Sequence, residues 1–171
     1  STPKIRIQFA HQLRKLRKDL DLTQEQMAER VGMDIRYYQR LESKTPNAVK
    51  LDTIDKIAKA LNLPPWKLLK FKVKRSPFLI LLPCYPSDRM ALYVLPEVTM
   101  RELRARIIFG KGVRKFRILF GWTQADLAKR AGISRSYLQR IESKNPPDIS
   151  IDIIGKLARA FRNPPWKLLL P

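Results

Sequence analysis

The side chains that could do chemistry in this chain are mostly cations, and they recur in one pattern twice. Tyr37-x-Gln39-Arg40-x-Glu42-Ser43-Lys44 returns one hundred residues later as Tyr137-x-Gln139-Arg140-x-Glu142-Ser143-Lys144. Arginine and lysine attract polyanions, and an arginine fork can donate two parallel hydrogen bonds to one partner. The pattern therefore indicates binding of an anionic partner at two places on one molecule.

Residues for catalysis or metal binding are sparse by comparison. The chain has one histidine, His11, and one cysteine, Cys84, and it lacks a glycine-rich phosphate loop and a cluster with metal-ligand spacing. We therefore expect no enzyme, no cofactor and no metal. A single cysteine also excludes an intramolecular disulfide framework and fits a reducing compartment.

The net charge is strongly positive. The 35 Lys and Arg against 15 Asp and Glu give +20, with 15 basic and 8 acidic residues in 1–70 and 16 and 5 in 101–171. Such a field attracts nucleic acid or an anionic membrane surface. The longest apolar run, residues 78–82, is too short to span a bilayer, and we expect no membrane segment.

The repeat extends far beyond the basic motif. Residues 6–69 and 106–169 align without a gap and are identical at 29 of 64 positions. A repeat of this length that occurs twice is typical of a duplicated domain rather than of a solenoid. We predict domain 1 over residues 1–70, a linker over 71–100 and domain 2 over 101–171.

Helical spacing of apolar residues predicts five short helices in each repeat and no strand. In the first copy the expected helices cover residues 5–20, 24–31, 35–41, 54–61 and 65–69. Thr23 is a suitable N-cap of the second helix, and Gly32 is a suitable stop. In the second copy Gly110 and Gly112 fall inside the first helix, and we expect them to bend or break it.

Two short helices joined by a tight glycine turn, the second rich in Arg and Gln, are the helix-turn-helix arrangement. With Thr23-Gln24 and Thr123-Gln124 ahead of the turn and the repeated Tyr-x-Gln-Arg motif behind it, both copies resemble the phage lambda repressor/Cro-like (XRE-type) helix-turn-helix family. The resemblance implies a mainly α fold of two five-helix domains. It also implies that the third helix of each domain enters the DNA major groove.

The resemblance assigns base contacts to the exposed start of each third helix. The matching residues are Ile35, Arg36, Arg40, Arg135, Ser136 and Arg140. An arginine there can bind guanine O6 and N7 together. For each arginine a phosphate contact or a solvated surface is the alternative, and Ile35 could instead pack against the protein. Asp34 is expected to cap its helix. Because its carboxylate would repel DNA phosphates, we expect copy one to bind DNA less tightly or to read a different half-site.

The resemblance also assigns backbone contacts and a structural role. Phosphate contacts fall on Gln24, Tyr37, Lys44, Gln124, Tyr137 and Lys144. A free surface lysine is the alternative for Lys144. Ion pairs between Arg17 and Glu42, and between Arg117 and Glu142, are implied to join the first helix to the third.

The linker has no counterpart in the repeat. Its apolar runs at 77–82 and 90–95, on either side of a turn, predict a short β-hairpin. An isolated hairpin is marginal in water and needs a partner surface. We hypothesise that residues 77–96 either form a homodimer or clamp the two domains together.

These observations predict a cytoplasmic, nucleoid-associated regulator of transcription. It would bind double-stranded DNA sequence-specifically, in the manner of a repressor, with two non-identical recognition helices on adjacent half-sites about 34 Å apart. The alternative is a protein-interaction module such as an antitoxin or a coactivator, in which the helix-turn-helix binds a polypeptide.

Overall fold

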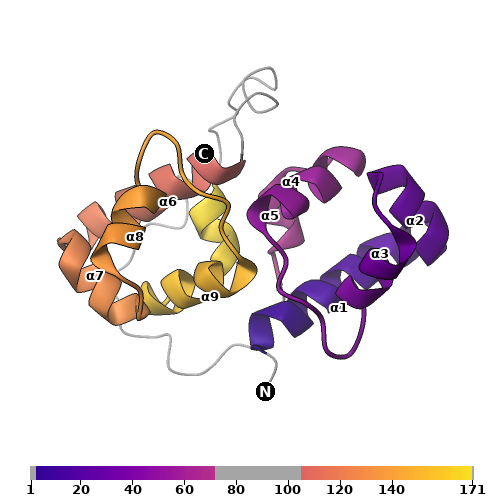
Figure 1. Cartoon of the computed structure of the whole chain (residues 1–171), viewed down its shortest axis with the longest axis horizontal. Coiled ribbons are helices and arrows are strands. Elements are labelled where there is room, and N and C mark those ends of the chain that lie inside the picture. Colours follow the sequence, from indigo (N-terminus) through magenta and orange to yellow (C-terminus); the bar gives the residue numbers. More distant parts are fainter. Residues whose placement is uncertain (1–2, 72–104, 171) are drawn as a thin grey trace, which may run out of the picture.

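The computed structural model describes residues 3–71 and 105–170, which form two helical domains side by side (Figure 1). The predicted hairpin and the proposed dimer segment, residues 77–96, lie outside the described residues. In the described part, the regular structure is helical and the β structure is a single antiparallel bridge. None of the helices described is long and apolar enough to cross a membrane.

Each repeat folds into five helical segments, and corresponding segments of the two repeats have similar lengths. Domain 1 contains α1 (Lys4–Asp19), α2 (Gln24–Val31), α3 (Ile35–Leu41), α4 (Leu51–Ala60) and α5 (Pro65–Leu68). Domain 2 contains α6 (Ala105–Leu119), α7 (Gln124–Ala131), α8 (Arg135–Ile141), α9 (Ile151–Ala160) and the 3-10 helix η1 (Pro165–Leu169). The last segment of domain 2 is thus a tighter helix than its counterpart α5.

Local sequence determines where the second helix of each domain begins and ends. The Thr23 hydroxyl accepts a hydrogen bond from the Gln26 amide, and the Gln26 side chain accepts one from the Thr23 amide. Thr123 makes the same reciprocal arrangement with Asp126. Each such capping box satisfies two backbone donors that the helix leaves free. Gly32, at φ 66°, then ends α2 in the left-handed conformation.

Glycine in α6 serves close packing, and the predicted break of the helix at these glycines is wrong. The helix runs without interruption from Ala105 to Leu119. A β-carbon on Gly110 would lie 2.3 Å from the Ile141 carbonyl oxygen, and one on Gly112 would lie 2.3 Å from the Leu168 carbonyl oxygen. Packing of α6 against α8 and η1 therefore offsets the helix-propensity cost, about 1 kcal/mol per glycine.

The two domains contact each other through equivalent residues. Lys50 and Ser150 form the antiparallel bridge, and they occupy the same position of the two repeats. The Leu51 amide donates to the Ile149 carbonyl at 2.8 Å, and the Ile151 amide donates to the Val49 carbonyl at 2.8 Å. A surface that pairs with its own copy in this reciprocal way implies an approximate two-fold axis between the domains.

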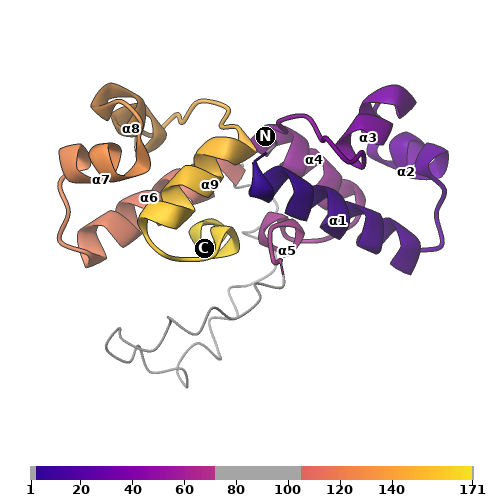
Figure 2. The same ribbon diagram turned by 90° about the horizontal axis from the view of Figure 1, so that it is seen from below.

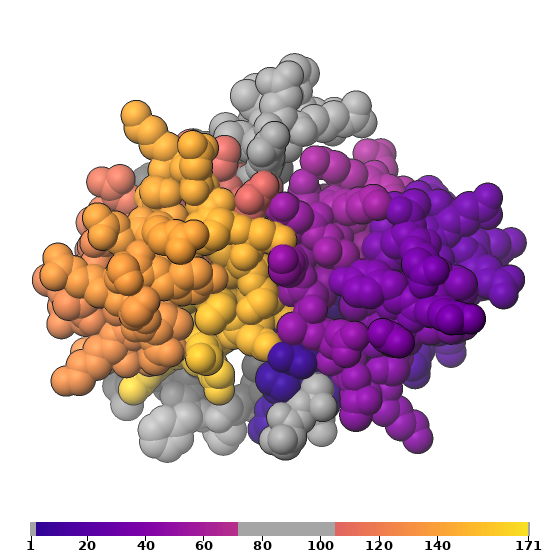
Figure 3. Space-filling view, viewed as in Figure 1, coloured from indigo at the N-terminus to yellow at the C-terminus, as the bar shows by residue number. Residues whose placement is uncertain are grey.

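Side chains repeat the same reciprocity. Arg6 of domain 1 pairs with Asp152 of domain 2, and Arg106 of domain 2 pairs with Asp52 of domain 1. The rings of Trp66 and Trp166 lie 6.2 Å apart between their centroids. In the space-filling view the two domains meet along a continuous contact (Figure 3), to which α1 with α9 and α4 with α6 contribute. The duplicated chain therefore has the architecture of a homodimer joined into one polypeptide.

Candidate nucleic-acid interface

The third helix of each domain lies on the same side of the molecule. Figure 2 shows α3 and α8 at the top, with α5 and the C-terminal end on the opposite side. The Asp34 carboxylate caps α3 by accepting from the Tyr37 amide at 3.0 Å, and Ser134 caps α8 by accepting from the Tyr137 amide at 3.2 Å. Two helices with capped starts are thus presented by one face.

Most of the predicted base-contacting residues are exposed on these helices. They are Arg36, Arg40, Arg135, Ser136 and Arg140. Ile35 differs, because it is half-buried and packs against the hydrophobic core. Of the predicted phosphate contacts on this face, Lys44 and Lys144 are exposed, whereas Tyr37 and Tyr137 are half-buried against the core.

A buried ion pair holds α1 against the end of α3. The Arg17 guanidinium donates to both carboxylate oxygens of Glu42 at 2.9 Å, and it also donates to the Leu22 carbonyl at 2.8 Å. Glu42 is 1% exposed, and its carboxylate accepts further bonds from Tyr38 at 2.7 Å and from Gln24 at 2.9 Å. The bidentate geometry fixes the orientation of α3 relative to α1.

These contacts determine the ionisation of the cluster. Burial alone would raise the pKa of Glu42, but hydrogen bonds from Arg17, Gln24 and Tyr38 outweigh it and hold that pKa below its usual value. Burial raises the pKa of Tyr38, and the hydrogen bond to Glu42 raises it further. The Tyr38 hydroxyl therefore remains a proton donor, and Glu42 remains a carboxylate at neutral pH.

Domain 2 contains the same ion pair with fewer partners, since in domain 1 the Glu42 carboxylate also lies 3.9 Å from the Arg14 guanidinium. Arg117 donates to both oxygens of Glu142 at 2.7 Å, and Gln124 donates to Glu142 at 3.0 Å. Leu138 stands where domain 1 has Tyr38, so this carboxylate lacks a tyrosine donor. Gln24 and Gln124, predicted to contact phosphate, thus brace the carboxylate with one amide proton and retain the second for another acceptor.

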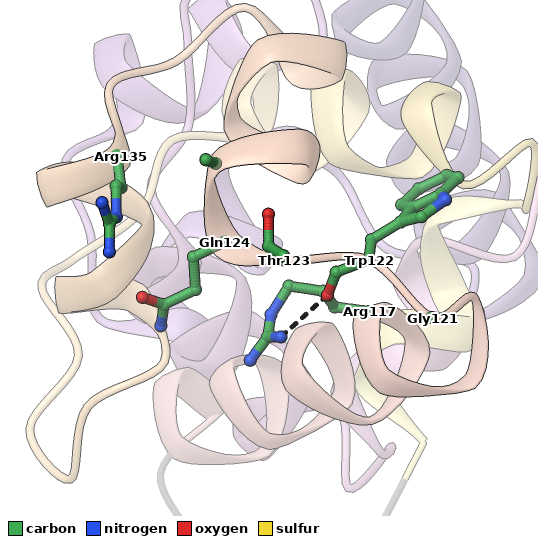
Figure 4. A pocket seen from close by; sticks show the side chains of 7 residues that line it. Arg117, Gly121, Trp122, Thr123, Gln124 and Arg135 are labelled. Carbon is green, nitrogen blue, oxygen red and sulfur yellow. Dashed lines mark hydrogen bonds between the residues drawn. The ribbon is translucent and has the colours of Figure 1, made fainter.

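Each domain has a hollow at the start of its second helix. In domain 2, Arg117, Gln124 and Arg135 come from three different helices around it (Figure 4). The corresponding hollow of domain 1 is lined by Arg14, Arg17, Lys18, Thr23, Gln24, Glu25 and Gln39. Helix N-termini and arginine side chains together favour a bound anion.

Comparison with known proteins identifies this pair of domains. The family model described as Helix-turn-helix matches the chain twice, over residues 13–65 and 113–165. The chain belongs to the helix-turn-helix family. These XRE-type domains are those of DNA-binding transcription regulators, and that is the general function which the family assigns to the chain.

One relative is named as a transcription factor. A protein named Neisseria hypothetical transcription factor, from Neisseria meningitidis serogroup B, is 34% identical over 77 residues, which cover 45% of this chain and 72% of the relative. No solved structure matches the chain.

The helix-turn-helix domains expose two residues that the sequence analysis did not assign to the site. Gln39 and Gln139 are exposed on α3 and α8, and Gln39 lines the hollow of domain 1. Both glutamines occur in the repeated basic motif, and this repetition could have predicted them as base contacts, since a carboxamide can bind adenine N6 and N7 together.

In the described residues, no group of three or more His, Cys, Asp or Glu side chains could hold a metal ion.

Proposed function

We propose that this helix-turn-helix protein is a sequence-specific regulator that binds DNA as a single-chain pseudo-dimer. It inserts α3 and α8 into two successive major grooves on one side of the duplex and, by occupying the operator, acts as a repressor. The reciprocal contacts between the domains are the observation that carries this proposal, because they fix two recognition helices relative to each other. Related dimers place such helices about 34 Å apart.

The proposed assignment of residues to base contacts and to phosphate contacts follows from their exposure and side-chain chemistry. Arg36, Arg40, Arg135 and Arg140 are exposed and can donate bidentately to guanine. Lys44 and Lys144 follow the recognition helices and bind phosphate, as do the free amide protons of Gln24 and Gln124. The two-fold relation predicts half-sites in inverted orientation, and the different residues at positions 35–36 and 135–136 predict different base sequences in them.

Selection of binding sites from a random double-stranded DNA library tests the proposal with the full chain. The expected result is an enriched site of two unequal, inverted half-sites with centres about 10 base pairs apart. Enrichment of a single half-site would contradict the pseudo-dimer, and no enrichment at all would contradict sequence-specific DNA binding. Binding to the selected site should also weaken steeply with salt as counterions are released.

A further inference from the structure

The two helix-turn-helix units differ in charge although their backbones follow the same plan. Residues 17–44 of domain 1 contain six basic and six acidic residues, a net charge of zero. The matching residues 117–144 of domain 2 contain six basic and two acidic residues, a net charge of +4. The domains therefore present unequal electrostatic surfaces to a polyanion.

Five carboxylates of domain 1 are absent from domain 2, and Asp126 of domain 2, which stands in place of Gln26, offsets one of them. Their positions in domain 1 are Asp19, Asp21, Glu25, Glu29 and Asp34, and all five are exposed. The corresponding residues of domain 2 are Leu119, Gly121, Ala125, Lys129 and Ser134. Among the residues that the structure describes, none of the five carboxylates forms a salt bridge. Their negative charge is thus directed to solvent without neutralisation by a neighbouring cation.

Two of these carboxylates lie where DNA would approach. Glu25 lines the hollow at the start of α2, and Ala125 occupies the same place in the hollow of domain 2. Asp34 caps the exposed start of α3, where domain 2 has the neutral cap Ser134. A charge at either position would act on a phosphate backbone bound to this face over about one Debye length, about 8 Å at physiological salt.

We infer that domain 2 is the high-affinity half of the pseudo-dimer and that domain 1 adds a weaker contact. Domain 2 engages its half-site first and anchors the protein, and domain 1 then samples the neighbouring groove. Repulsion between the domain 1 carboxylates and the phosphates makes the second contact dependent on a good match of bases. This inference rests on the proposed function, since it assigns different roles to the two halves of the same DNA-binding face.

Exchange of the charged residues between the domains tests the inference in the full chain. One variant combines Ala125→Glu and Ser134→Asp, and the other combines Glu25→Ala and Asp34→Ser. Serine and aspartate are both good helix caps, so the exchanges at 34 and 134 preserve helix starts. The matched control is Lys67→Glu, which also changes the net charge by two units but lies exposed on α5, away from α3 and α8 (Figure 2).

Affinity for the selected operator, measured by fluorescence anisotropy at fixed salt, gives the readout. We expect the domain 2 variant to bind at least about fivefold more weakly and the domain 1 variant several-fold more tightly, with little change for the control. Equal weakening by the domain 2 variant and by Lys67→Glu would overturn the inference, because net charge alone would then explain the effect. Failure of the unmodified protein to bind any duplex would instead reject the proposed function.

Discussion

The side chain of Ile5 fills the space beside Gly155, where a β-carbon on residue 155 would lie 3.1 Å from the Ile5 terminal methyl carbon. Ile5 is on α1 and Gly155 on α9, so this contact joins the two domains. The matching residues on the other side of the approximate axis are Ala105 and Asp55. The interface is therefore reciprocal in its backbone and its ion pairs, but not at this apolar contact.

Substitution at this contact should destabilise the protein. Gly155→Asp introduces the residue found in domain 1 and directs a carboxylate at a buried isoleucine, with an expected cost of about 1–3 kcal/mol. Urea unfolding of the full chain measures it. The double variant with Ile5→Ala should cost less than the sum of the single changes, because the smaller side chain makes room. Strict additivity would show that the two residues do not interact.

Removal of the Glu42 carboxylate should destabilise domain 1 more than the matching change destabilises domain 2. Glu42→Ala leaves Arg17 buried without its partner and removes the acceptor of the Tyr38 hydroxyl, with an expected loss of about 3–5 kcal/mol. Glu142→Ala is the matched control, since Leu138 has no hydroxyl to lose. Equal losses in the unfolding free energy would argue against a role for the tyrosine.

Stability should fall in acid partly through Glu42. Its pKa is lowered in the folded protein, so its contribution is fully present above the unfolded pKa, about 4.3, and is lost as pH falls through the lower folded pKa. Melting temperatures recorded from pH 6 down to pH 2 should show a shallower acid decline for Glu42→Gln than for the unmodified protein. Parallel curves would assign the acid sensitivity to other carboxylates.

Arg140 and Lys144 should affect DNA binding in different ways. Arg140→Ala is expected to cost about 1–3 kcal/mol on the selected operator and to relax the base preference at one position. Lys144→Ala should weaken binding to all duplexes alike and reduce the salt slope by about one. Comparison of operator and unrelated DNA at several salt concentrations separates the two effects, with Lys67→Ala as the control on the opposite side of the molecule. If Arg140→Ala weakened binding to operator and unrelated DNA equally, Arg140 would be assigned to phosphate contact rather than base contact.

The fixed relation between the domains should make binding depend on helical phase. Insertion of five base pairs between the half-sites turns one of them to the far side of the duplex, and a rigid pseudo-dimer cannot follow it. Affinity should then fall to that of a single half-site, which a gel shift on paired DNA probes can measure. Retention of full affinity would show that the domains separate and bind independently.

Local features of this fold could be predicted from the sequence, and contacts between distant segments could not. Thr23 and Gly32 are recognisable as the limits of α2 because caps and left-handed stops act within a few residues. The predicted break at Gly110 is wrong because this glycine allows close packing against Ile141, which is thirty-one residues away in the sequence. A helix-propensity scale contains no information about such a contact.

In the candidate site, too, local features could be predicted from the sequence and long-range contacts could not. Exposure of Arg40 and Arg140 follows from helical periodicity, whereas the half-burial of Ile35 depends on packing that no local pattern specifies. The reciprocal pairing of Arg6 with Asp152 and of Arg106 with Asp52 was likewise outside the reach of the sequence. The repeat in the sequence predicts two domains, but the residues that join them can be identified only from the structure.

The bridge between Lys50 and Ser150 affects how operator occupancy should depend on the concentration of the protein. Regulators that assemble from separate subunits lose their DNA-binding form on dilution, and their occupancy then varies with a higher power of concentration. In the proposed complex each polypeptide would bring both halves to the operator together, at an effective concentration that does not depend on how many copies the cell holds. Occupancy should therefore rise hyperbolically with the number of molecules, so that a gene under this control would respond gradually rather than at a threshold.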